Sequence, residues 1–106
     1  MSEKCLVMKW DYEYDKEGYW FDNDSGEERY ELKAGASYTL PHISSKSLEI
    51  RSVTVDGGTV TAEVYVDYHT VTVSSDGEPV AAHASYSYTA AGDSVSQSMS
   101  MKLSIE

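Results

Sequence analysis

The feature that most constrains the fold is the alternation of apolar and polar residues along most of the chain. Between Leu6 and Tyr14, for example, every even-numbered residue is a large apolar or aromatic one. A period of two places successive side chains on opposite faces of a β-strand, whereas the three-and-four spacing of an amphipathic helix is never sustained. The sequence therefore predicts an all-β protein whose strands are buried on one face and solvated on the other.

Three turn signals divide the second half of the chain, from Leu48 onward, into four strands. These signals are Asp56-Gly57-Gly58, Asp76-Gly77 and Ala91-Gly92-Asp93. Folding the chain back at each turn makes the apolar faces coincide, with Val55 opposite Val60 and Val73 opposite Val80. Because a slip of one residue would turn the apolar side chains to water, this agreement predicts a C-terminal β-meander.

The alternation changes phase at two places, near Arg51-Ser52 and near His69-Thr70. Each phase break predicts a β-bulge or a bend. A bend near His69 would carry the long run from Thr59 to Val73 from one sheet into another, as happens at the corners of sandwiches and small barrels. We therefore predict an antiparallel β-sandwich or partly open barrel of seven to eight strands, formed by residues 1–106 as a single domain.

The first third of the chain combines aromatic residues with turn-forming ones. A short aromatic run, Tyr19-Trp20-Phe21, precedes the string Asp22-Asn23-Asp24-Ser25-Gly26. Such strings are typical of turns, so we predict a hairpin with its polar tip at residues 22–26. Trp10, Tyr12 and Tyr14 alternate with polar residues and are expected to face the core.

The aromatic run is the predicted binding site for a ligand or a protein partner. Because Tyr19, Trp20 and Phe21 are consecutive, they cannot all face inward, and at least one ring should be accessible. Accessible rings beside carboxylates suit a protein-interaction hot spot, and they also suit stacking against the apolar face of a sugar.

The charge balance favours some partners and excludes others. The chain has 18 acidic and 8 basic residues, for a formal net charge of −10. The negative electrostatic field of such a chain repels nucleic acid and anionic membranes but attracts a protein with a basic surface. We predict a non-catalytic protein-interaction or regulatory module, with a small-molecule- or carbohydrate-binding β-sandwich as the alternative. An exposed sheet edge would also permit a homodimer.

No cofactor is predicted, and metal sites are disfavoured. Asp22, Asp24 and Glu28 resemble the spaced carboxylates of a calcium loop, but the string lacks the third ligand position and the closing acid of an EF-hand. Turn formation is the simpler explanation of these residues. His69 and His83 should point to opposite faces of their hairpin, which disfavours a shared zinc ion.

Catalytic signatures are missing from the sequence as well. It contains no nucleophile elbow and no phosphate-binding loop, so we do not expect an enzyme. The single cysteine, Cys5, precludes an intramolecular disulfide. With no long apolar run and no signal peptide, a cytoplasmic location is predicted, or a secreted one if a signal peptide has been removed.

Overall fold

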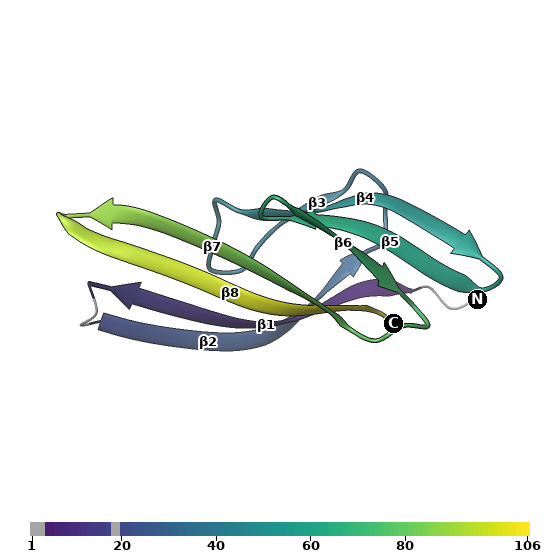
Figure 1. Cartoon of the computed structure of the whole chain (residues 1–106), viewed down its shortest axis with the longest axis horizontal. Coiled ribbons are helices and arrows are strands. Elements are labelled where there is room, and N and C mark those ends of the chain that lie inside the picture. Colours follow the sequence, from purple (N-terminus) through teal and green to yellow (C-terminus); the bar gives the residue numbers. More distant parts are fainter. Residues whose placement is uncertain (1–3, 18–19) are drawn as a thin grey trace.

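The computed structural model describes residues 4–17 and 20–106 and contains eight strands and no helix in these ranges (Figure 1). The strands are β1 (Cys5–Lys16), β2 (Trp20–Glu31), β3 (Ser37–Thr39), β4 (Ser47–Asp56), β5 (Thr59–Val66), β6 (His69–Ser74), β7 (Val80–Ala90) and β8 (Asp93–Ile105). The prediction of an all-β chain is therefore confirmed.

The strands form two antiparallel four-stranded sheets, as in a β-sandwich. Sheet A has the order β2-β1-β8-β7, and sheet B has the order β3-β4-β5-β6. The chain thus makes one hairpin in sheet A, crosses to build all of sheet B, and returns to sheet A for its last two strands (Figure 1). The first and last strands, β1 and β8, are neighbours in sheet A and are hydrogen-bonded to each other.

The core lies between the two sheets and is formed by the alternating apolar residues. Sheet A contributes Leu6, Met8, Trp10, Tyr12, Ala84, Met99, Met101, Leu103 and Ile105, and sheet B contributes Leu48, Ile50, Ala62, Val64, Val66 and Val73. Leu40 and Ile43, on either side of Pro41 in the β3–β4 loop, complete this cluster. Burial of these faces fixes the strand registers, because a shift by one residue would expose them.

Several registers agree with the sequence. Val55 lies opposite Val60 across the β4–β5 turn, and a β-bulge falls between Ile50 and Ser52. In the last hairpin Ala84 lies opposite Met99. The C-terminal strands follow one another as a meander, as predicted, but the meander is divided between the two sheets after β6.

Two predictions about the middle of the meander are wrong. Asp76-Gly77 does not close a hairpin: β6 pairs with β5 and β7 pairs with β8, so the chain crosses between sheets here and Val73 does not face Val80. The phase break near His69 is instead a hairpin turn, in which Asp67 and Tyr68 both have positive φ. Two successive residues with positive φ are typical of the tight turn that matches strand twist.

The predicted turn at residues 22–26 is also wrong, because these residues lie within β2. Each of them pairs with a residue of β1, and the chain reverses between Lys16 and Trp20 instead. Gly26 has a packing reason to be there: a Cβ atom at this position would lie 2.7 Å from the Trp10 ring. Cross-strand pairing and this close contact override the turn propensity of the string.

Candidate functional site

The two sheets differ in length, and part of sheet A is left without a covering layer. Strands of sheet A have 11 to 13 residues, whereas those of sheet B have 3 to 10. The molecule is elongated, 54 × 21 × 19 Å, and both hairpins of sheet A project beyond sheet B at the left of Figure 1. The inner face of sheet A is therefore open at this end.

Side chains from all four strands of sheet A meet on this open face. The register places side by side the row Asp22, Tyr14, Gln97, Tyr86 and the row Trp20, Lys16, Val95, Tyr88. We call the set Tyr14, Trp20, Asp22, Tyr86, Tyr88 and Gln97 the tyrosine platform. Tyr86 and Tyr88 are each 37% exposed and their ring centroids are 5.5 Å apart. Aromatic faces and a carboxylate are thus available to a binding partner on one surface.

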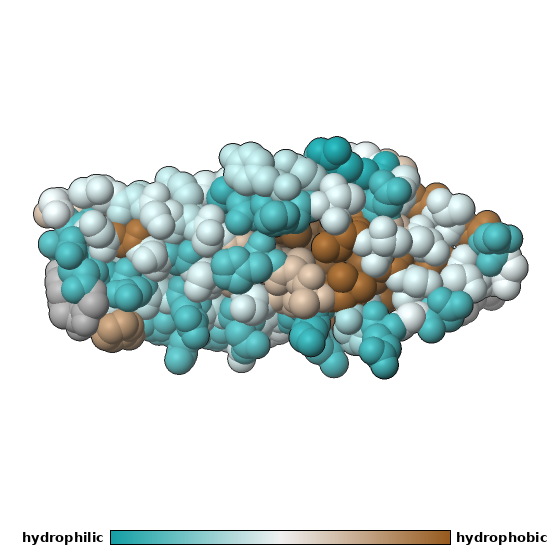
Figure 2. Space-filling view, viewed as in Figure 1, coloured by the Kyte–Doolittle hydropathy of each residue, from teal (hydrophilic) through white to brown (hydrophobic). Residues whose placement is uncertain are grey.

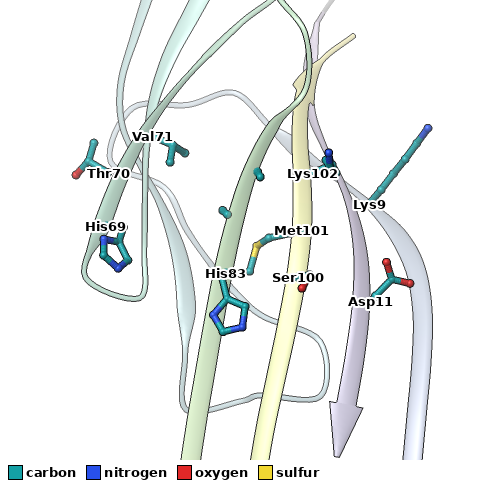
Figure 3. Close-up of a pocket in the computed structure, with 11 residues that line it drawn as sticks. Lys9, Asp11, His69, Thr70, Val71, His83, Ser100, Met101 and Lys102 are labelled. Carbon is teal, nitrogen blue, oxygen red and sulfur yellow. The ribbon is translucent and has the colours of Figure 1, made fainter.

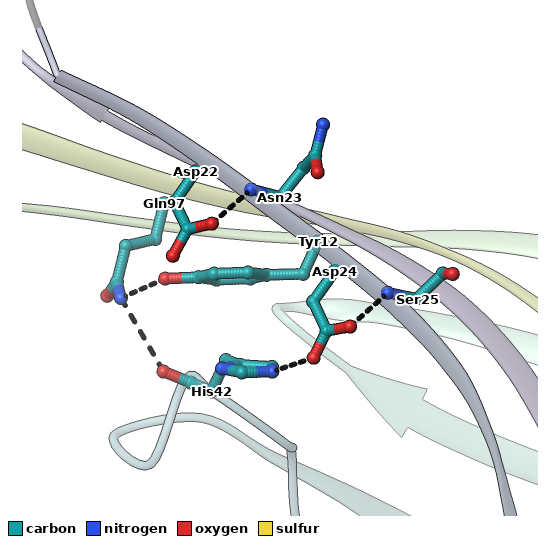
Figure 4. A network of polar contacts seen from close by, with 7 residues as sticks. All are labelled: Tyr12, Asp22, Asn23, Asp24, Ser25, His42 and Gln97. Carbon is teal, nitrogen blue, oxygen red and sulfur yellow. Dashed lines mark hydrogen bonds and ion pairs between the residues drawn. The ribbon is translucent and has the colours of Figure 1, made fainter.

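A polar network marks the border between the platform and the core (Figure 4). His42, from the β3–β4 loop, stacks on Tyr12 with ring centroids 4.5 Å apart, and its Nε2 lies 2.8 Å from the Asp24 carboxylate. The Gln97 side-chain amide donates to the Tyr12 hydroxyl at 2.6 Å. The β3–β4 loop is therefore the last element that covers the inner face of sheet A. The rows that contain Tyr14 and Lys16 lie beyond it and are open.

The electrostatics of this end are strongly negative. His42 and the Ser25 amide hold the pKa of the Asp24 carboxyl below its ordinary value, so this group is ionised at neutral pH. Residues 11–24 carry one basic side chain, Lys16, and six acids: Asp11, Glu13, Asp15, Glu17, Asp22 and Asp24. Such a concentration of one charge attracts cationic groups of a partner.

The predicted aromatic site is accessible, although only part of it joins the platform. Trp20 is 61% and Phe21 is 67% exposed, as the argument from consecutive residues required. Their side chains point to opposite faces of sheet A, because they are neighbours on β2, and only Trp20 faces the platform. Tyr19 lies outside the described residues.

Sequence reasoning missed the three tyrosines that make up half of the platform. Tyr86 and Tyr88 alternate in phase with core residues, and nothing in that phase shows that they lie beyond the core. Tyr14, which was expected to face the core, is partly buried and packs against it at the edge of the platform. The signal that distinguishes Tyr86 and Tyr88 is strand length. The strands β7 and β8 have 11 and 13 residues, whereas the longest strand of sheet B, β4, has 10. The distal half of the β7–β8 hairpin can have no partner in the other sheet.

The residues of the calcium hypothesis do not form a loop. Asp22, Asp24 and Glu28 lie along the extended strand β2, where alternate residues are about 7 Å apart. The turn on which that hypothesis depended is not there. Within the described residues no group of three or more His, Cys, Asp or Glu side chains is placed to hold a metal ion.

A second feature is an apolar cavity of about 600 Å³ where β6 adjoins sheet A (Figure 3). Val71, Ala82 and Met101 contribute apolar atoms to its lining, and Figure 2 shows apolar side chains exposed near the crossing of β6 and β7. His69 and His83 both line this cavity. The prediction that they lie on opposite faces of one hairpin is wrong, because β6 and β7 belong to different sheets.

The β5–β6 turn is fastened to sheet A by one carboxylate. Asp67 accepts a hydrogen bond from Lys46 Nζ at 2.9 Å and another from the backbone amide of Ser85, on β7, at 3.0 Å. Lys46 Nζ also lies 5.0 Å from the ring centroid of Tyr68, which is highly exposed. Burial alone would raise the pKa of the Asp67 carboxyl, but the bonds from Lys46 and Ser85 hold it below its usual value.

Because the Asp67 pKa is depressed by folding, its contribution to stability should depend on pH. It is present above the unfolded-state pKa and is lost as the pH falls through the folded-state pKa. We expect Asp67→Asn to lower the free energy of unfolding by about 1 to 2 kcal/mol near neutral pH. Denaturant unfolding should show this difference shrinking in strong acid, whereas Glu63→Gln, at an exposed carboxylate of β5, should have little effect. A deficit in Asp67→Asn that persists unchanged in strong acid would contradict this account.

Comparison with protein-family models, with curated proteins and with solved structures finds no match to this chain. The part of the chain that the structure describes contains no apolar helix long enough to cross a membrane. Any function must therefore be argued from the geometry of the molecule.

Proposed function

We propose that this protein is a non-catalytic interaction module that binds a basic segment of a partner protein on the tyrosine platform. The observation that carries the proposal is the open inner face of sheet A, where Tyr86, Tyr88 and Trp20 are exposed beside Asp22. Rings that stand on a rigid sheet lose little conformational freedom when they bind, which favours them as anchors.

Tyrosine and carboxylate together suit an arginine or lysine side chain. The ring face attracts the cation, and the carboxylate pairs with it by a charge-assisted hydrogen bond. The chain uses this combination twice for its own cations. Tyr68 and Asp67 hold Lys46, and Tyr65 and Glu49 hold Arg51, whose guanidinium carbon lies 4.0 Å from the Tyr65 ring centroid.

The platform offers the same pair of groups to a partner. Asp22 stands in the row next to Trp20 and one strand away from Tyr14. The Asp22 carboxylate accepts a bond from the Asn23 amide, and within the described residues no basic side chain forms a salt bridge with it. A guanidinium of the partner could therefore stack on a ring and reach this carboxylate at the same time.

Titration with an oligoarginine peptide tests the proposal, with an oligoglutamate peptide as the control. We expect binding to the first peptide alone, with an affinity that falls as salt rises. Trp20→Ala should weaken binding about tenfold. Phe21→Ala, at the similarly exposed neighbour on the opposite face, should change it little. Asp22→Asn should weaken binding too, whereas Asp56→Asn, at the distant end of β4, should not.

Two results would overturn the proposal. One is equal loss in Trp20→Ala and Phe21→Ala, since the opposite faces of β2 cannot both belong to one platform. The other is binding that does not respond to salt. The paired rings of Tyr86 and Tyr88 also suit stacking on a sugar, so a salt-insensitive complex with a neutral oligosaccharide would favour a carbohydrate-binding function instead.

A further inference from the structure

The edges of the two sheets differ in how they are protected from pairing with another chain. An unpaired edge strand is usually blunted by charges, proline, shortness or a covering loop. The edge strand β2 is rich in acids, β3 has three residues and β6 has six. The fourth edge strand, β7, has 11 residues, and from Val80 to Gly92 the chain has no Asp, Glu, Lys, Arg or Pro.

Part of the β7 edge is nevertheless closed by Asp67. The backbone amide of Ser85 donates to the Asp67 carboxylate, so this amide points away from β8 and out of sheet A. Alternate residues of a strand share this direction, so the amides of Ser87 and Thr89 also point outward. Between the Asp67 contact and the Ala91-Gly92 turn, Ser87 and Thr89 are the two positions where the backbone can pair with a new strand.

We infer that two copies of this protein pair antiparallel through β7, around a twofold axis at Tyr88. This is the symmetric arrangement that uses both free positions: Ser87 of one copy exchanges two hydrogen bonds with Thr89 of the other, and the axis repeats the exchange. Tyr86 then lies opposite Ala90 of the second copy, a large side chain against a small one. The two tyrosine platforms join into one continuous surface.

The self-complementary register favours a second copy of this chain as the occupant of the β7 edge, and charge limits their contact to that edge. Each chain has a net charge of −10, so two copies repel each other over most of their surfaces. The uncharged β7 edge is where that repulsion is smallest. Higher salt screens the remaining repulsion and should strengthen the dimer, whereas it should weaken the binding of a basic segment. The opposite effects of salt therefore distinguish the dimer from the binding of a basic segment, and either proposal can fail without the other.

Disulfide trapping tests the register. In a Cys5→Ser background, Tyr88→Cys should form a disulfide-linked dimer under mild oxidation, because facing residues at such a position have Cα atoms about 4.5 Å apart. Tyr86→Cys, two residues along the same face, should not, since the two cysteines would be separated by about 13 Å. Trapping of both variants alike, or of Tyr86→Cys in preference, would overturn the proposed pairing.

Sedimentation at high protein concentration gives a second test that needs no cysteine. We expect a monomer–dimer equilibrium that shifts toward dimer as salt rises, and Thr89→Pro should abolish it by removing an outward amide. Thr89→Ala, which keeps both the backbone amide and the charge, is the matched control and should leave the equilibrium unchanged. A chain that stays monomeric at every salt concentration would refute the dimer.

Discussion

Replacing Ile43 by Ala is expected to lower the free energy of unfolding by about 3 kcal/mol, within the range of 2 to 5 for truncating a buried aliphatic side chain. Ile43 is 1% exposed and belongs to the core cluster, although it comes from a loop. The loop is tightly closed, with the Lys46 amide donating to the Ile43 carbonyl at 3.1 Å. The Ile43 side chain therefore fills the space between the two sheets at the end of the core that borders the platform.

The same variant should also disturb the border of the platform, because His42 is the residue next to Ile43. Urea unfolding measures the loss of stability, and the stacking of His42 on Tyr12 can be followed by the chemical shifts of both rings. Ile43→Val, which removes one methylene, should cost only about 1 kcal/mol. If Ile43→Ala were as stable as Ile43→Val, the loop would not be part of the core.

Gly26→Ala is the second change expected to have a large effect. The added Cβ would lie 2.7 Å from Cζ2 of Trp10. The Trp10 ring cannot move away freely, because it is buried and its centroid lies 5.4 Å from that of the His42 ring. Overpacking of this kind costs about 1 to 3 kcal/mol. That exceeds the stabilisation of about 0.5 to 1 kcal/mol that alanine usually gives over glycine.

Gly77→Ala is the matched control for this prediction. A Cβ at residue 77 would meet Ser74 at 3.6 Å, an ordinary van der Waals contact. We therefore expect thermal unfolding to show a lower melting temperature for Gly26→Ala and almost no change for Gly77→Ala. The opposite order would mean that Trp10 does not lie over Gly26.

The sequence was most informative where burial fixes the strand register. Val55 lies opposite Val60, as alternation and turn chemistry predict. Val55 itself is 68% exposed, but a slip by one residue would expose Ala62, which is fully buried in the same hairpin. The sequence was least informative at residues 22–26, where pairing with β1 and the space needed by Trp10 prevail over local turn propensity. Local propensity is a weak guide where tertiary contacts decide.

The division of strands between sheets could not be derived from alternation. Val73 and Val80 satisfy the apolar pattern of a hairpin, yet they lie in different sheets, because a sandwich presents one apolar interior to both. The tyrosine platform was hidden for a related reason. Tyr86 and Tyr88 follow the same alternation as Ala84, and they differ only in having no strand of sheet B opposite them.

Mapping the binding of an oligoarginine peptide by the backbone amide resonances of the protein tests the central claim most directly. If the tyrosine platform is the binding site, the resonances that shift should belong to its six residues and to their neighbours in sheet A. The six residues are Tyr14, Trp20, Asp22, Tyr86, Tyr88 and Gln97. The resonances of the cavity beside β6, around Val71, should stay in place. Shifts confined to that cavity or to the outer face of sheet B would contradict the account.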